Sequence, residues 1–310
     1  MAQSVIFENK KYLMKLPNWY TEYKDFIELS INRFIRAYLA IPMSEPLEWF
    51  KEVVFYSIKW GKKLRAILAL EFYLSLTWKK LSDIKYEDDI VKLCIALEIM
   101  HAFSLIHDDL PCMDNDELRR WEPTVWKKYS EFEAVLVGDM FNSLSFELIS
   151  DIKDAKASQS IAKLISHSVG FYGMVWGQVE DIHYESHEWD LNIEILEWLH
   201  AKKTWKLIEA SIVAGCILSW ETANIDVYGN FWKKLGLAFQ VKDDILDVEG
   251  TPEETGKSVG WEEKGFVYLV WLAASKKILA DEIADCKKIS HTLGSEKIDF
   301  LVDFVAHRKK

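Results

Sequence analysis

The chain is short of glycine. It has 13 glycines in 310 residues, whereas the average usage of about 7% would give roughly 22. Tryptophan is in excess instead, with 14 residues in a chain of ordinary size. The shortage of the smallest residue and the surplus of the largest are the compositional anomaly of this sequence.

Other scarcities exclude whole classes of protein. The four cysteines are scattered without a C-x-x-C pair, so neither a zinc site nor a disulfide framework is indicated and a reducing cytoplasm is expected. The formal net charge of -11 argues against a nucleic-acid binder, which would carry a basic face. The N-terminus lacks the apolar run of a signal peptide. The most apolar internal stretch, residues 208–220, contains Glu209 and is too short to span a bilayer. We therefore expect a soluble protein.

Signals for β-sheet are nearly missing as well. The chain has six prolines and no Asn-Gly or Asp-Gly pair, whereas apolar residues recur at three- and four-residue spacing almost everywhere. No linker, repeat or low-complexity tract divides residues 1–310. We predict one all-α domain, with helices near 18–40, 46–60, 64–77, 87–108, 129–151, 157–172, 192–220, 224–249, 263–289 and 295–308.

Two acidic clusters lie at predicted helix ends. In HDDLPCMDND, Asp108 and Asp109 end a helix because Pro111 disfavours its continuation, and Asp114 and Asp116 follow on an irregular segment. In FQVKDDILDVEG, Asp243 and Asp247 are four residues apart, as are Gln240 and Asp244, so these side chains share one helical face. Carboxylates stacked in this way repel one another unless a cation or solvent intervenes. A solvated acidic face is the simpler interpretation of either cluster alone, but apolar residues flank both. Carboxylate oxygens favour hard divalent cations, and Mg²⁺ is the natural candidate where phosphate oxygens complete its coordination shell.

Compact basic elements accompany the acids. They are Lys62, Lys63 and Arg65, then Arg119 and Arg120, then Lys202 and Lys203 before Thr204, and Lys257. Carboxylates with a metal, guanidinium groups and ammonium groups form the chemistry that grips a diphosphate. The apolar surroundings indicate a diphosphate with a hydrocarbon tail.

These motifs resemble those of the trans-isoprenyl diphosphate synthases. Residues 98–129 resemble the first aspartate-rich motif of the family, and LGLAFQVKDDILDVEG resembles the second. GKKLR, GQVED and AKKT resemble three accessory elements, in the family's order. The resemblance implies a single large helical bundle around a deep central cavity, commonly a homodimer, that condenses isopentenyl diphosphate with an allylic diphosphate.

The resemblance also implies roles for individual residues. Several Mg²⁺ ions would be held by Asp108, Asp109, Asp114, Asp243, Asp244 and Asp247. The allylic diphosphate would contact Arg119, Lys203, Thr204, Gln240 and Lys257. Isopentenyl diphosphate would be bound by Lys62, Arg65, His101 and Arg120, although His101 taken alone is equally an ordinary core histidine. No protein nucleophile is required, which agrees with the lack of a Ser-His or Cys-His arrangement in the sequence.

Product length in the family depends on bulk just before the first aspartates. Phe103 lies five residues before Asp108, beside the small Ser104. An aromatic residue there resembles the farnesyl-forming pattern and is expected to face the cavity. Farnesyl diphosphate is therefore the expected product and geranylgeranyl diphosphate the alternative. A non-catalytic subunit of a prenyl synthase and a terpene cyclase are less consistent with six retained aspartates and the GKKLR element.

The tryptophans replace glycine where the chain departs from the family. This holds for Trp60, Trp121, Trp176, Trp205 and Trp232, and more weakly for Trp78, Trp220, Trp261 and Trp271. Nine further glycines would bring the total to about 22, the average usage. Either these positions are glycine in the native protein, through a UGA codon read as glycine, or the chain is a genuinely tryptophan-rich relative.

Overall fold

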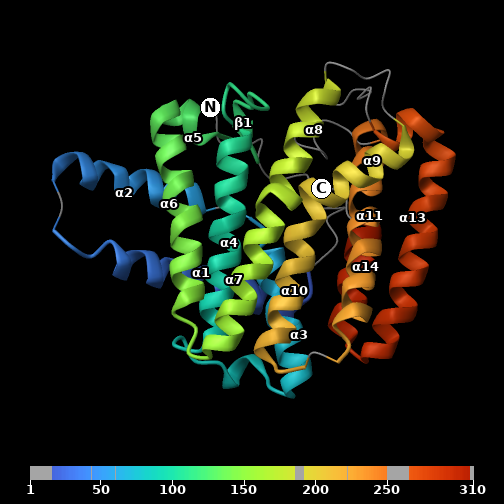
Figure 1. The fold of residues 1–310 in the computed structure, drawn as a ribbon, viewed down its shortest axis with the longest axis horizontal. Coiled ribbons are helices and arrows are strands. Elements are labelled where there is room, and N and C mark those ends of the chain that lie inside the picture. Colours follow the sequence, from blue (N-terminus) through green and yellow to red (C-terminus); the bar gives the residue numbers. More distant parts are fainter. Residues whose placement is uncertain are drawn as a thin grey trace, which may run out of the picture.

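The computed structural model is an up-and-down bundle of α-helices (Figure 1). It describes residues 16–42, 44–59, 61–185, 192–221, 223–249 and 265–307. The helices of its first half are α1 (Asn18–Tyr38), α2 (Glu45–Ile58), α3 (Leu64–Thr77), η1 (Leu81–Asp83), α4 (Asp89–Asp108), α5 (Val125–Lys128) and α6 (Glu131–Ser150). Those of the second half are α7 (Ala155–Val169), η2 (Phe171–Val175), α8 (Trp176–Glu185), α9 (Ile193–His200), η4 (Ala201–Trp205), α10 (Lys206–Leu218), α11 (Ile225–Glu249), α13 (Phe266–Leu293) and α14 (Glu296–His307).

The prediction of an all-α fold is confirmed, with three local differences. A two-stranded antiparallel hairpin, β1 (Leu118–Arg119) and β2 (Glu122–Pro123), follows the first acidic cluster. Helix α8 lies in a stretch where no helix was predicted. The single helix expected over 192–220 is interrupted at η4, where the backbone forms a wider π-helical turn. Hydrophobic periodicity predicts neither a π-helical turn nor a hairpin this short, because both lack a repeating pattern.

Helix α4 is the centre of the core. It contacts α1, α2, α3, α6 and α10, and its residues Leu97, Ile99 and Met100 are completely buried. Burial of each such side chain contributes about 1.5–3 kcal/mol. Helix α4 is also the one helix among the described residues long and apolar enough to cross a membrane, but two thirds of that stretch is buried inside the bundle.

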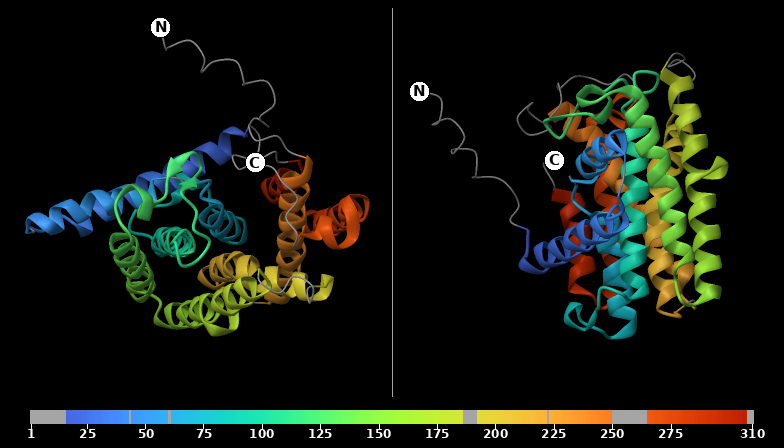
Figure 2. Two further views of the ribbon diagram at one scale, coloured as in Figure 1. Left: turned by 90° about the horizontal axis from the view of Figure 1, so that it is seen from above. Right: turned by 90° about the vertical axis from the view of Figure 1, so that its left-hand side faces the viewer.

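Helices α1 and α2 lie across the bundle instead of along it (Figures 1 and 2). Tyr23, Ile27, Ile31 and Ile35 recur every four residues on the buried face of α1, which is the spacing of one helical stripe. This stripe packs on α3 and α4. Helices α4 and α11 both end in the upper part of the bundle in Figure 1.

Candidate active site

A cavity of about 590 Å³ lies where α2, α3, α4 and the β1–β2 hairpin meet, and Phe239 of α11 contributes to its wall. Its basic lining residues are Lys62, Lys63, Arg65, Arg119 and Arg120, together with His101. Its acidic lining residues are Glu98, Asp109, Asp116 and Glu122. The structure therefore brings together the predicted site residues Lys62, Arg65, His101, Arg119, Arg120 and Asp109.

A tight loop brings the basic residues to this cavity. Between α2 and α3, Gly61 has φ +142° and Lys63 has φ 53°, which turns the chain sharply into α3. A Cβ on Gly61 would lie 3.1 Å from Nη1 of Arg120. Glycine at this position therefore lets a guanidinium from the hairpin approach the backbone of the loop.

Two buried nitrogens among the basic residues of the cavity make no hydrogen bond to the described residues. They are Nε of Arg65 and Nδ1 of His101. Burial lowers the pKa of Arg65 to about 10, so the guanidinium stays charged at neutral pH. Burial, followed by the cationic neighbours Arg65 and Arg120, lowers the pKa of His101 well below its ordinary value, so its ring is neutral. An unsatisfied guanidinium N–H among other cations, beside a histidine nitrogen that donates in one tautomer, is the arrangement expected for binding an anion.

Glu98 lies beneath these cations and was not among the predicted site residues. It is 5% exposed, and its carboxylate accepts a hydrogen bond from the backbone N–H of Ala66 at 3.1 Å. Its charge raises the pKa of Lys63 and of Arg65 against the larger effect of burial. The sequence does contain a signal, because Glu98 precedes His101 by three residues and so lies on the same side of α4.

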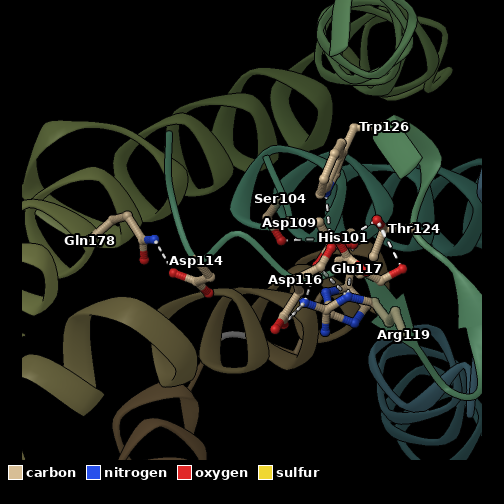
Figure 3. Close-up of polar contacts among 10 residues, drawn as sticks. All are labelled: His101, Ser104, Asp109, Asp114, Asp116, Glu117, Arg119, Thr124, Trp126 and Gln178. Carbon is tan, nitrogen blue, oxygen red and sulfur yellow. Dashed lines mark hydrogen bonds and ion pairs between the residues drawn. The ribbon is translucent and has the colours of Figure 1, made fainter. Parts of the chain in front are cut away.

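The first acidic cluster lies at the end of α4, as predicted (Figure 3). The backbone N–H of Asp114 donates to the carbonyl of Asp108 at 2.9 Å, which folds the irregular segment back. Asp109 is 3% exposed, and Nε of Arg119 donates to both of its oxygens at 2.7 and 3.0 Å. Burial raises the pKa of Asp109, and the bond from Arg119 opposes that rise. Asp116 lies 3.5 Å from the same guanidinium.

The second acidic cluster occupies the last turns of α11. Nε2 of Gln240 donates to Asp244 at 3.1 Å, so the predicted sharing of a helical face is confirmed. The other oxygen of Asp244 accepts from the backbone N–H of Phe266 at 2.7 Å, at the start of α13. Asp243 and Asp247 are half-buried on the same helix.

The carboxylates fit Mg²⁺ by their chemistry, because both clusters offer only oxygen ligands at the same end of the bundle (Figure 1). Within the described part of the chain, however, no three Asp, Glu, His or Cys residues already lie close enough to form a complete metal site. Asp109 is engaged by Arg119 and Asp244 by Gln240. Ions bound here would need further oxygen ligands, such as those of a diphosphate.

The remaining predicted residues are placed less completely. Lys203 and Thr204 belong to η4, and Lys257 lies outside the described residues. Neighbouring Lys202 donates to the carbonyl of Tyr172 at 2.9 Å.

Gln178 of α8, in the GQVED element, was not assigned to the site, yet its Nε2 lies 3.5 Å from Asp114 (Figure 3). The unpredicted helix α8 therefore reaches the first acidic cluster.

Phe103 and Ser104 lie on α4 but do not line the cavity. The ring of Phe103 packs edge-on against His107, with ring centres 5.0 Å apart. Ser104 is 8% exposed, and its hydroxyl donates to the carbonyl of His101. Phe103 is therefore placed beside the face of α4 that packs on α6, where His107 contacts the carbonyl of Val135.

Comparison with known proteins agrees with this geometry. Residues 47–292 match the polyprenyl synthetase family. The chain is 36% identical to the farnesyl diphosphate synthase of Micrococcus luteus, over 93% of this chain and 97% of that protein. It is 34% identical to geranylgeranyl pyrophosphate synthase 4 of Arabidopsis thaliana, over 90% of this chain and 75% of that protein.

Solved structures are similar over nearly the whole chain. The geranyltransferase from Helicobacter pylori, complexed with magnesium and isoprenyl diphosphate, superposes with a TM-score of 0.76 at 29% identity, covering 95% of this chain and 98% of that one. The geranyltransferase from Legionella pneumophila gives a TM-score of 0.79 at 27% identity, covering 94% and 96%. The predicted family is therefore confirmed: the chain belongs to the polyprenyl synthetase family.

Proposed function

We propose that this prenyltransferase condenses isopentenyl diphosphate with dimethylallyl or geranyl diphosphate to form farnesyl diphosphate. The observation that carries the proposal is that one cavity contains both the unsatisfied nitrogens of Arg65 and His101 and the pair formed by Asp109 and Arg119. Farnesyl diphosphate synthases among its relatives support the product. One basic group for each diphosphate is what a two-substrate condensation needs.

The residues divide into two groups by the substrate they would bind. Isopentenyl diphosphate is held by Lys62, Arg65, His101 and Arg120. The allylic diphosphate is contacted by Arg119 and Gln240, with Lys203, Thr204 and Lys257. Mg²⁺ ions held by the six aspartates of the two clusters would supply positive charge opposite the departing diphosphate.

The chain's own residues contribute binding and electrostatics. The C–O bond of the allylic diphosphate breaks, and its electron pair leaves with the diphosphate. Arg119 and Gln240, oriented by their bonds to Asp109 and Asp244, stabilise this growing negative charge with their remaining N–H groups. Arg65 and His101 orient isopentenyl diphosphate so that its double bond attacks the allylic carbon. The released proton passes to the diphosphate, so no side chain needs to act as a base.

Replacing Glu98 with glutamine tests the electrostatics of the isopentenyl diphosphate site. Glutamine keeps the oxygen that accepts from Ala66 but removes the charge that raises the pKa of Arg65, a proposed ligand of isopentenyl diphosphate. The pKa of Arg65, already lowered by burial to about 10, should fall further. The alkaline limb of the kcat/KM profile for isopentenyl diphosphate is therefore expected to move to lower pH. An unshifted limb in Glu98→Gln would contradict this role.

Product length is tested at Phe103. Phe103 lies outside the 590 Å³ cavity, so we propose that the growing chain passes along the face of α4 that carries Phe103 and His107. Phe103→Ala is then expected to extend the product from fifteen to twenty carbons, because it removes bulk on that face. Gas chromatography of dephosphorylated products from mutant and parent measures the change. Phe34→Ala is the matched control, since Phe34 is a half-buried ring on a different helix, α1, and so does not lie on the face of α4 that carries Phe103. Identical product lengths in mutant and parent would refute the role of Phe103.

The geranylgeranyl diphosphate alternative is favoured by relatives that bear that name at 34% identity. Incubation of the protein with Mg²⁺, dimethylallyl diphosphate and isopentenyl diphosphate distinguishes the possibilities. A C15 product supports the proposal and a C20 product supports the alternative. A cyclic hydrocarbon from a longer diphosphate would indicate a cyclase. A lack of any product would indicate a non-catalytic subunit.

We also propose that the enzyme is a cytoplasmic homodimer in which residues 1–310 form one domain. The exposed face of α6 supports a dimer, because Phe132, Val135 and Leu136 are 65%, 38% and 52% exposed. Such a contiguous apolar strip is typical of a protein interface. All four cysteines are free thiols and three are buried, which suits a reducing compartment. Sedimentation equilibrium measures the oligomeric state.

A further inference from the structure

Four tryptophans occupy backbone conformations that favour glycine. Among the described residues, seven residues other than glycine have positive φ, and four of these are tryptophan: Trp78, Trp121, Trp220 and Trp271. Tryptophan makes up only 14 of the 310 residues, so it is strongly concentrated at these positions. A bulky side chain at positive φ is a genuine outlier, whereas glycine adopts the conformation readily.

Two of the four lie directly after helices. Trp78 follows α3 with φ 57° and ψ 28°, and the N–H of Lys79 returns to the carbonyl of Leu74 at 3.1 Å. This is the helix-ending motif in which the left-handed residue is usually glycine. Trp220 ends the turn after α10 with φ 64°. Both indoles project into solvent, with 94% and 72% exposed.

Trp121 lies in the turn between β1 and β2. The pairing of Arg119 with Glu122 leaves Arg120 and Trp121 as a two-residue loop. Their φ values are 56° and 70°, and a hairpin loop with positive φ at both positions prefers glycine at the second. The indole is 59% exposed.

Trp271 has the least favourable backbone dihedral angles of the four. Its φ of 66° and ψ of 154° interrupt α13, in a region of backbone space that is nearly restricted to glycine. Its indole is 71% exposed. The four conformations together would consume a large share of the net stability of a typical domain. Because all four rings face mainly solvent, little packing offsets that strain.

Two buried tryptophans add an independent anomaly. The indole nitrogens of Trp205 and Trp232 are buried without a hydrogen-bond partner among the described residues. A Cβ built on Gly236 would lie 2.5 Å from the ring of Trp205, so that ring fits only against a glycine. A buried indole N–H normally finds an acceptor. Both of these residues have helical backbones, and so the backbone argument does not extend to them.

Other tryptophans of the same chain are built into the structure in the usual way. Nε1 of Trp49 donates to Glu133 at 2.6 Å, and Nε1 of Trp126 donates to the carbonyl of Asp116 at 2.9 Å. Trp19 packs edge-on against Tyr23 and Phe300. The chain therefore contains two kinds of tryptophan position, one that uses the indole and one that is strained by it.

We propose that positions 78, 121, 220 and 271 are glycine in the functional protein, because one codon is read there as glycine. Independent substitutions would replace glycines at unrelated turns with various residues, whereas a single decoding rule replaces all of them with the same one. Glycine at position 121 would also remove a ring from the wall of the cavity. The proposal does not depend on the catalytic activity, since backbone conformation alone carries it.

Mass spectrometry of peptides from protein made in its native cells tests the proposal directly. Peptides that span positions 78, 121, 220 and 271 are expected to have the mass of glycine at each position and of tryptophan at position 126. Tryptophan at any of the four positions overturns the proposal.

A recombinant pair tests the physical reason behind it. The variant with Trp78→Gly, Trp121→Gly, Trp220→Gly and Trp271→Gly is expected to melt about 10 °C above the chain as written. Trp49→Gly and Trp126→Gly, made separately as controls, are expected to lower the melting temperature. A quadruple variant that melts at or below the unchanged chain would overturn the proposal. Neither readout uses prenyl transfer, so an inactive protein would count against the proposed function and not against this inference.

Discussion

Asp109→Asn is expected to lower kcat/KM by about a hundred- to a thousandfold. The carboxylate is buried at the end of α4, where Arg119 donates to both of its oxygens. Asparagine keeps the shape but removes the charge, which weakens the hold on Mg²⁺ and leaves Arg119 without its ionic partner. Removal of one preorganised group that acts on the transition state costs about 2.7–4 kcal/mol, and each 1.36 kcal/mol in the barrier is tenfold in rate.

The Mg²⁺ dependence identifies the cause of this loss. If Asp109 holds the metal, the activity of Asp109→Asn should recover in part as the Mg²⁺ concentration rises. Asp116→Asn is the matched control, because Asp116 lies 3.5 Å from the same guanidinium but is not among the six aspartates proposed to hold Mg²⁺. Its loss should be less than about tenfold. Equal losses in both variants, with no response to Mg²⁺, would assign Asp109 to structure alone.

Arg65→Gln is expected to raise KM for isopentenyl diphosphate about a hundredfold and to change KM for the allylic diphosphate little. Nε of Arg65 is buried and unsatisfied in the cavity beside His101. A hydrogen bond to a charged group contributes about 1.5–3 kcal/mol, and a guanidinium can donate two of them to one phosphate. Steady-state kinetics with each substrate varied in turn measures both constants.

Arg36→Gln is the control for the loss of a positive charge. Arg36 is an exposed residue of α1 whose guanidinium lies over the ring of Phe55, away from the cavity. Its replacement should leave both constants unchanged. The proposed division of the two substrates would be wrong if Arg65→Gln raised KM for the allylic diphosphate as much as for isopentenyl diphosphate.

Local patterns predicted most of the helices, because each helix buries a stripe that repeats along the chain. The end of α4 at Asp108 follows from Pro111, and the contact between Gln240 and Asp244 follows from their four-residue spacing. The failures are at irregular backbone. Helix α8 brings Gln178 to within 3.5 Å of Asp114, and the π-helical turn η4 interrupts a predicted helix, and no local period encodes either feature.

The sequence predicted the types of residue in the candidate site, but it did not predict all of the residues that form it. Spacing indicated which carboxylates share a helix, but it could not indicate that Glu98 lies beneath Lys63 and Arg65. That contact joins α4 to the start of α3 across 32 residues of sequence. The interpretation of the tryptophans also changed. The motifs emphasised Trp60, Trp121, Trp176, Trp205 and Trp232, of which Trp60 lies outside the described residues. The backbone instead singles out Trp78, Trp121, Trp220 and Trp271, so only Trp121 is common to both.

The amino-acid sequence by itself determined the all-α class, the family and the two acidic motifs, because these depend on residue types at short spacing along one helix. Only the tertiary structure decided which cations share a cavity, which carboxylate is engaged by Arg119, and which tryptophans lie at positive φ. Those properties depend on how helices distant in sequence pack and on how the chain turns between them. Burial then lowers the pKa values of Lys63, Arg65 and His101, and burial exists only in the folded molecule.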